Sequence, residues 1–165
     1  MKIAFLDIDG VFNSEQYACS DEYKAETAGM SDAHIMLIAH HLHLDPKAIL
    51  LFNDLVERSG CKVVLSSTWR EKYTVDEMNN MLAGRGATFK IIDRTPKIIG
   101  KFSEVIPRGK EINEYLNSLK EVPESFVIID DYDDMLHLKP FLVRTNVEFG
   151  LTQNDVERAL QILNR

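Results

Sequence analysis

Short, unbroken apolar runs alternate along this chain with longer stretches in which apolar residues recur at helical spacing. Runs such as Val63-Val64-Leu65 and Phe126-Val127-Ile128-Ile129 are typical of strands that are covered on both faces. The pattern predicts strands at 2–6, 62–66, 89–92, 126–129 and near 141–144, and helices at about 46–59, 75–83, 109–120 and 153–164. This alternation predicts an α/β fold with a mostly parallel sheet and helices on both faces.

Several helix boundaries carry their own signals. Asp45-Pro46 is an N-cap followed by a proline in the first turn, and Ser59-Gly60 supplies a terminating glycine. Residues 13–45 have a weaker pattern, which predicts only a helix around 32–43. We therefore expect one domain over 1–165, a three-layer, Rossmann-like, doubly wound sheet, with 13–45 as a minimal cap or lid insertion.

Polar residues follow three of the predicted strands. Asp7, Asp9 and Gly10 come after the first strand, Ser66 follows the second along the chain, and Asp130-Asp131 follows a later one. The carboxyl ends of parallel strands meet at one edge of a sheet, where such folds bind ligands. Carboxylates that converge there repel each other, so a divalent cation is expected between them. Gly10 allows a sharp turn and a close approach of the backbone to a ligand.

Composition narrows the possible partners. A net charge of −7 argues against binding nucleic acid through one large basic face. No stretch is apolar enough to span a membrane, the N-terminus does not resemble a secretory signal, and two cysteines make no disulfide framework. We therefore expect a cytoplasmic protein. Locally, a basic segment over 94–110 and an acidic cluster over 130–134 suit a metal-dependent phosphate site, although two solvated loops would explain them as well.

Taken in order, these motifs resemble those of the haloacid dehalogenase-like (HAD) hydrolase superfamily. The likeness spans 7–131: Asp7-Ile8-Asp9-Gly10-Val11 after the first strand, Ser66 after a later one, Lys110 at the start of a helix, and Asp130-Asp131 after the next strand. The resemblance implies a phosphatase that acts through an aspartyl phosphate.

The resemblance also implies a role for each residue. Asp7 is the expected nucleophile. Asp9 is the expected general acid and base, and its backbone carbonyl is expected to help hold Mg²⁺. Asp7 and one of Asp130 or Asp131 complete the oxygen ligands. Ser66 is expected to bind the phosphoryl oxygens.

The cation of the phosphate site has several candidates. Lys110 is preferred because it lies at the start of the helical pattern, and Arg108 is its rival. Lys97 and Lys101 lie in the same segment, where an exposed lysine is usually a solvated surface charge.

The second motif continues as Ser67-Thr68-Trp69-Arg70, which is similar to a subgroup of the superfamily linked to nucleic-acid repair, as is Gly150-Leu151-Thr152. Together with Gly10 and Arg108, Ser67 and Arg70 are therefore candidate substrate-binding residues. Trp69 either stacks on a base or, the favoured alternative, packs over the sheet edge.

Other polar clusters have simpler explanations. His34, His40, His41 and His43 suggest zinc, but their spacing fits no ligand pair, so polar decoration of a helix is favoured. Asp133 and Asp134 either support the metal ligands or cap the following helix.

Segment lengths limit the substrate. About 33 residues over 13–45 and about 17 over 93–109 are too few for a cap domain of roughly 50 residues. An open site favours phosphate on a nucleic-acid 3′ end or a nucleotide. The alternatives are a small-metabolite phosphatase or 5′-nucleotidase with 13–45 as a lid, and a catalytically inactive binding module.

Overall fold

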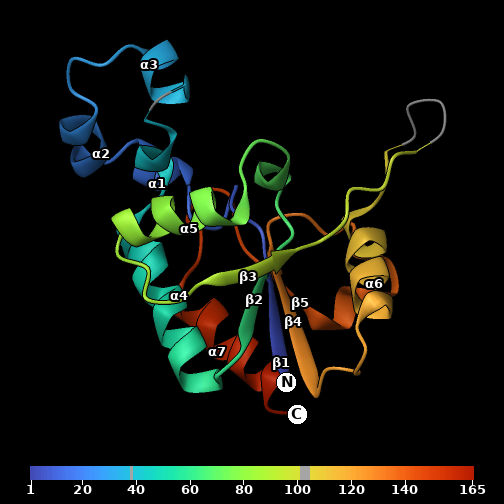
Figure 1. Cartoon of the computed structure of the whole chain (residues 1–165). Helices are drawn as coiled ribbons and strands as arrows, with labels where there is room; N and C mark the ends of the chain where they lie inside the picture. Colours follow the sequence, from blue (N-terminus) through green and yellow to red (C-terminus); the bar gives the residue numbers. More distant parts are fainter. Residues whose placement is uncertain (38, 101–104) are drawn as a thin grey trace.

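Five parallel strands form the centre of the molecule in the computed structural model, which describes residues 1–37, 39–100 and 105–165 (Figure 1). Their order across the sheet is β3-β2-β1-β4-β5, so the first strand lies in the middle. The strands are β1 (Lys2–Leu6), β2 (Lys62–Leu65), β3 (Ile91–Arg94), β4 (Ser125–Asp130) and β5 (Leu142–Arg144). Each pairs in parallel with its neighbour, which confirms the predicted sheet.

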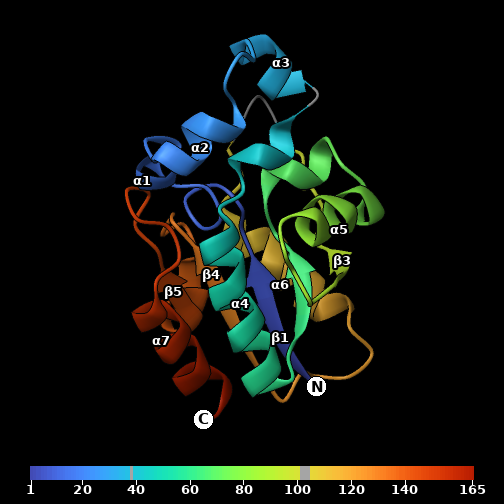
Figure 2. The same cartoon turned by 90° about the vertical axis from the view of Figure 1, so that its left-hand side faces the viewer.

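Helices cover both faces of this sheet (Figures 1 and 2). The longer helices are α4 (Pro46–Ser59), α5 (Val75–Gly84), α6 (Arg108–Ser118) and α7 (Gln153–Leu163). Alternate residues of β1 point to opposite faces. Leu6 packs with the apolar residues of α4, α5 and α7, whereas Phe5 packs with those of α6 and the 3-10 helix η4 (Leu136–Phe141). The result is the predicted three-layer α/β fold.

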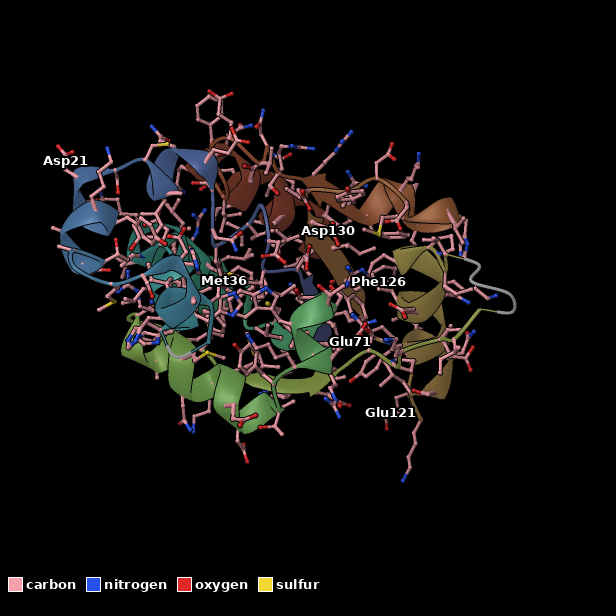
Figure 3. The ribbon with its side chains drawn as sticks, turned by 90° about the horizontal axis from the view of Figure 1, so that it is seen from above. Asp21, Met36, Glu71, Glu121, Phe126 and Asp130 are labelled. Atoms are coloured by element: carbon pink, nitrogen blue, oxygen red, sulfur yellow. The ribbon has the colours of Figure 1, made fainter. Side chains whose placement is uncertain are left out.

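The stretch between β1 and α4 consists of short elements. They are α1 (Glu15–Ala18), α2 (Asp21–Glu26), α3 (Asp32–Leu37) and the 3-10 helix η1 (His40–His43). The single helix predicted over 32–43 is therefore wrong in its extent, and position 38 of that prediction lies outside the described residues. Seen from above the sheet, Asp21 and Met36 lie to one side of Asp130 (Figure 3).

Strand β3 begins two residues later than predicted. Phe89, the first apolar residue of the predicted strand, is buried beside Phe52 at a ring-centroid distance of 4.7 Å without joining the ladder. Asp93 and Arg94 belong to the strand because an edge strand tolerates polar side chains. In the described parts of the chain, no helix is both long and apolar enough to cross a bilayer.

The first turn of α6 packs tightly against the segment after β4. Gly109 donates its backbone N–H to the Asp134 carbonyl at 3.2 Å, and a β-carbon at residue 109 would overlap the Met135 backbone. Backbone atoms cannot move aside as a flexible side chain can. Glycine at this position therefore sets how closely α6 approaches the carboxyl end of β4.

We predict that Gly109→Ala lowers the free energy of unfolding by roughly 2 kcal/mol or more, because the methyl group forces α6 away from Met135. Urea denaturation measures the loss. Gly84→Ala is the matched control: Gly84 lies in α5 with no atom near its would-be β-carbon, so alanine should be neutral or stabilising by up to about 1 kcal/mol. Equal stability of the two variants would contradict the packing argument.

Candidate active site

One row of polar side chains crosses the carboxyl edge of the sheet. Leu6 of β1 pairs with Leu65 of β2 and Ile129 of β4, so the next residues, Asp7, Ser66 and Asp130, lie side by side. Backbone hydrogen bonds extend the ladders to them: the Asp7 N–H donates to the Ile129 carbonyl at 3.0 Å and the Ser66 N–H to the Leu6 carbonyl at 2.9 Å. The structure thus brings together the residues that the sequence predicted to follow three strands.

Three aspartates form an acidic cluster in this row. Carboxylate oxygens of Asp7, Asp130 and Asp131 all lie within 4.8 Å of one another. Asp7 is 5% exposed and Asp130 only 1%. Burial raises the pKa of the Asp7 carboxyl, and burial followed by the charge of Asp7 raises the pKa of Asp130 to about 8. Burial also raises the pKa of Asp131. These carboxyl groups are therefore poorly stabilised as anions unless a cation joins them.

The donor set fits a hard divalent cation such as Mg²⁺. All three side chains offer oxygen atoms, which such ions prefer. The Asp130 Oδ1 atom accepts from the Tyr132 N–H at 2.9 Å, whereas its Oδ2 atom is buried and has no hydrogen-bond partner in the described parts of the chain. A buried oxygen without a partner is costly, and a cation would satisfy it.

Asp9 has a different environment. Its exposed carboxylate accepts the Trp69 Nε1–H at 3.1 Å from each oxygen and the Asn13 Nδ2–H at 2.7 Å. The side chain does not belong to the acidic cluster. If Asp9 contacts a metal ion, the contact is therefore expected through its backbone carbonyl. Its carboxyl group remains available for proton transfer.

Gly10 forms the predicted turn directly after Asp9. Its φ of +67° lies in the left-handed region, and its N–H donates to the Asn13 Oδ1 atom at 2.8 Å. A β-carbon at this position would overlap the side chain of Asp131. Glycine therefore allows the loop to lie against the acidic cluster.

Of the two candidate cations, Arg108 lines the cavity above Asp7, whereas the preferred Lys110 does not. The charge of Arg108 opposes the rise in the pKa values of Asp7, Asp130 and Asp131. Its Nη1 atom is buried and lacks a partner among the described residues. Lys110 is exposed and does not line the cavity, because two residues turn the helix by about 200°. Lys97 lines the cavity but pairs with Glu71, and Lys101 lies outside the described residues.

The two serines after β2 are both buried. Ser66 has its hydroxyl oxygen buried without a partner in the described structure, beside Asp7, as a phosphoryl-binding group would require. The Ser67 hydroxyl accepts the Trp69 N–H at 3.3 Å and caps the 3-10 helix η2 (Thr68–Glu71).

Arg70 holds the site together from inside the protein. Its Nη1 group donates to the carbonyls of Ser66 at 2.6 Å and Ser67 at 2.8 Å, and its Nη2 group forms a buried ion pair with Glu111 of α6. Both terminal nitrogens of Arg70 thus have protein partners, although the residue lines the cavity and its Nε atom has no partner among the described residues. Substrate binding by Arg70 stays a prediction. Glu111 was missed in the sequence, although it lies three residues after Arg108 and hence on the same face of α6.

Trp69 is buried, which confirms the packing alternative. It stacks on His40 of η1, with ring centroids 4.1 Å apart and an angle of 14° between the planes. Within the described ranges the only group of metal-binding side chains is the acidic cluster, so the structure assembles no zinc site from the histidines.

Asp134 caps α6 rather than the following helix. Its Oδ2 atom accepts the Arg108 N–H at 3.0 Å, whereas Asp133 pairs with Lys139 on the surface. This contact fixes the start of the helix that carries Arg108.

A cavity of about 580 Å³ lies above these residues. Its lining includes Asp7, Asp9, Asp131 and Arg108, together with residues that follow β3, and none of the described residues from 14–43. The short helices after β1 therefore do not close the site in this structure.

One comparison with known families gives a match that covers most of the chain. The model of the HAD domain in Swiss Army Knife RNA repair proteins matches residues 3–156. The chain belongs to this family. Searches of curated proteins and of solved structures returned no match. Membership of the HAD family and the Rossmann-like sheet support a general assignment as a HAD-type hydrolase or phosphatase.

The buried acidic cluster of this HAD domain predicts an unusual pH dependence. Between pH 6.5 and 8, folded Asp130 holds a proton that the unfolded chain, with an ordinary value of 3.8, has lost. The unfolded state binds fewer protons, so stability in EDTA falls as pH rises through about 8. We expect the melting temperature to drop by roughly 5 °C or more between pH 6.5 and 8.5. Mg²⁺ should restore stability more strongly at the higher pH, since it binds the ionised carboxylates.

Asp130→Asn is the control for this measurement, because asparagine does not titrate and should make the profile shallower. Burial lowers the pKa of His40 to about 4, so His40 contributes little over this range. A melting temperature in EDTA that rises over the same interval would contradict the assignment.

Proposed function

We propose that the protein is a Mg²⁺-dependent phosphatase that hydrolyses phosphate monoesters through an aspartyl phosphate on Asp7, with nucleic-acid 3′ ends or nucleotides as substrates. The observation that carries the proposal is the position of Asp7, buried between Asp130 and the unpartnered hydroxyl of Ser66, with Arg108 above it. A nucleophile, a cation site and two phosphoryl-binding groups thus share one end of the sheet.

Asp7, Asp130, Asp131 and the backbone carbonyl of Asp9 are the groups that would hold Mg²⁺. When bound, the ion neutralises the clustered carboxylates and the charge on the phosphoryl oxygens. The Ser66 hydroxyl and the Arg108 guanidinium bind the remaining oxygens and stabilise the charge that develops in the transition state.

The reaction then proceeds in two displacements. A carboxylate oxygen of Asp7 attacks phosphorus, the bond to the leaving oxygen breaks, and Asp9 donates its proton to that oxygen. Asp9 next takes a proton from water, whose oxygen attacks phosphorus and breaks the bond to Asp7. Inorganic phosphate leaves, and both aspartates return to their starting states.

The choice of a nucleic-acid substrate has two supports. The family is described as a domain of RNA repair proteins, and the described residues of 14–43 leave the cavity above Asp7 uncovered. A phosphate at the end of a large molecule needs such access, whereas small metabolites are usually enclosed by the enzyme.

Hydrolysis of p-nitrophenyl phosphate tests the reaction class. We expect turnover with Mg²⁺, none with EDTA, and a loss of about a thousandfold or more in kcat for Asp7→Asn, because the amide cannot form the covalent intermediate. A panel of 3′-phosphorylated oligonucleotides, nucleotides and sugar phosphates then ranks the substrates by kcat/KM. Activity retained in Asp7→Asn would refute the mechanism, and preference for sugar phosphates would refute the substrate class. No turnover on any substrate would favour the inactive binding module.

The two candidate cations provide a second test. Arg108→Ala should lower kcat/KM by roughly 100-fold to 1,000-fold, because a group that stabilises the transition-state charge is lost. Lys110→Ala, which removes the same charge two residues away on the exposed face of α6, should stay within roughly twofold of the parent protein. The reverse order of effects would return the role to Lys110.

A further inference from the structure

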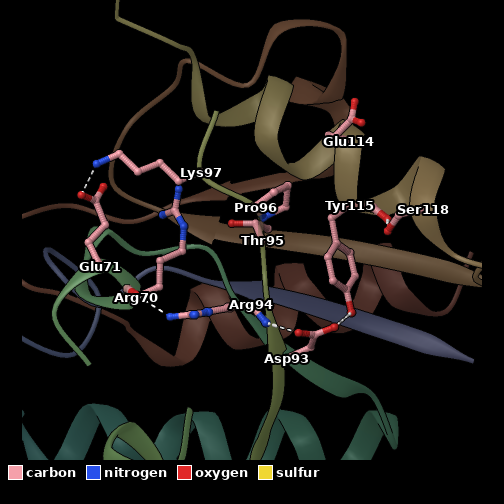
Figure 4. A pocket seen from close by; sticks show the side chains of 10 residues that line it. All are labelled: Arg70, Glu71, Asp93, Arg94, Thr95, Pro96, Lys97, Glu114, Tyr115 and Ser118. Atoms are coloured by element: carbon pink, nitrogen blue, oxygen red, sulfur yellow. Dashed lines mark hydrogen bonds and ion pairs between the residues drawn. The ribbon is translucent and has the colours of Figure 1, made fainter. Parts of the chain in front are cut away.

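A second cavity, of about 850 Å³, adjoins the one above Asp7. It lies between the end of β3 and helix α6 (Figure 4). Arg70, Glu71 and Lys97 line both cavities, so the two cavities adjoin at these side chains. A ligand held at Asp7 that passes these side chains would reach the second cavity.

Thr95 continues the row of polar side chains across the sheet. Leu65 of β2 pairs with Arg94 of β3, so Thr95 lies beside Ser66, and its N–H donates to the Leu65 carbonyl at 2.9 Å. Asp93, two residues earlier, contacts Tyr115 of α6, which places Thr95 on the same face of the sheet as Asp7.

The Thr95 hydroxyl is buried and makes no hydrogen bond within the described parts of the chain. The residue is 2% exposed. Buried polar groups are nearly always paired, and an unpaired one costs about 1–3 kcal/mol. Among the described residues, Ser66, Arg108 and Asp130 also carry buried atoms without a partner, as do Arg70, Asp134 and His43. Thr95 thus shares this property with several groups around the cavity above Asp7.

The charged side chains that line the second cavity balance in number: Arg70, Arg94 and Lys97 against Glu71, Asp93 and Glu114. The charge available near Thr95 therefore depends on which of them already have partners. Glu71 is paired with Lys97, and Asp93 accepts from the Tyr115 hydroxyl at 3.0 Å and from the Arg94 N–H at 2.8 Å. The Arg94 guanidinium donates to the Arg70 carbonyl at 2.7 Å and makes no ion pair within the described ranges. In Figure 4, Arg94 extends toward Arg70 and Lys97 toward Glu71, whereas Glu114 and Tyr115 lie on the opposite side of Thr95.

We propose that the second cavity binds the internucleotide phosphate next to the terminal phosphate of a nucleic-acid strand, with Thr95 donating a hydrogen bond and Arg94 supplying the positive charge. The proposal rests on the phosphatase function and makes its substrate more specific. Thr95 lies two strands from Asp7, about 10 Å by strand spacing, so a ligand that contacts both residues must extend beyond a single phosphate. A mononucleotide or a metabolite has no phosphate at this place.

Thr95→Val tests the proposal directly, because valine keeps the shape and removes only the hydroxyl. The substrates are a ribodinucleotide with a 3′-phosphate, the corresponding 3′-mononucleotide and p-nitrophenyl phosphate. For the parent protein we expect the dinucleotide to have the lowest KM. Thr95→Val should raise that KM roughly threefold to tenfold and Arg94→Gln roughly tenfold or more, as expected for a neutral and a charged hydrogen bond. The effect of either variant on kcat/KM for p-nitrophenyl phosphate, which has no second phosphate, should be smaller than its effect on the dinucleotide.

Three controls make the outcome specific. Thr95→Ser keeps the hydroxyl and should preserve the preference for the dinucleotide. Lys120→Gln removes an exposed charge outside both cavities and should have no effect. Thr95→Val should unfold at the same or a higher urea concentration than the parent, since no hydrogen bond within the protein is lost.

Binding of the dinucleotide and the mononucleotide to the Asp7→Asn protein tests the second site separately from the phosphatase function, because a binding measurement needs no turnover. Tighter binding of the dinucleotide than of the mononucleotide, reduced by Thr95→Val, would support the second site. Equal binding of the two, or a Thr95→Val protein that binds both as the parent does, would overturn it while leaving hydrolysis of p-nitrophenyl phosphate intact. Loss of all hydrolysis with retained dinucleotide preference would overturn only the phosphatase proposal.

Discussion

Repulsion among buried carboxylates is the constraint on which this site depends. Asp7 and Asp130 end neighbouring strands, so the parallel register that builds the sheet also forces their charges together. Neither can move apart without breaking the ladder, and burial leaves little water to screen them. A cation or a proton must therefore accompany the folded state. The repulsion that destabilises the metal-free acidic cluster would be relieved by a hard metal ion, so it favours binding of such an ion.

A buried ion pair ties the two sides of the site together. Arg70 holds the carbonyls of Ser66 and Ser67 after β2, and Glu111 connects it to the helix that carries Arg108. Breaking such a pair on one side leaves a buried charge without a partner, which is strongly unfavourable. Ser66 and Arg108 are thus positioned by one interaction, although they lie more than 40 residues apart in the sequence.

The sequence predicted the sheet well because strand ends and their polar residues are local signals. All five strands lie within two residues of their expected bounds, and Asp7, Ser66 and Asp130 meet where parallel pairing requires. The orientation of side chains in the first turn of α6 was harder to predict. Lys110 and Arg108 differ only in which side of the helix they occupy, and that depends on the Asp134 cap and on the contact of Gly109 with Met135. The ion pair of Arg70 with Glu111 was not predicted, because the two residues are distant in sequence.

The environment of Asp9 explains how two aspartates only two residues apart can take different roles. Asp7 is buried in the acidic cluster, where a metal ion would hold it as an anion ready to attack. Asp9 is exposed, and the indole of Trp69 and the amide of Asn13 orient its carboxylate away from that cluster. Trp69 in turn stacks on His40, from the stretch between β1 and α4. In the mechanism we propose, a carboxyl group that is fixed in direction yet open to water would exchange its proton between the two displacements, as an acid that becomes a base must do.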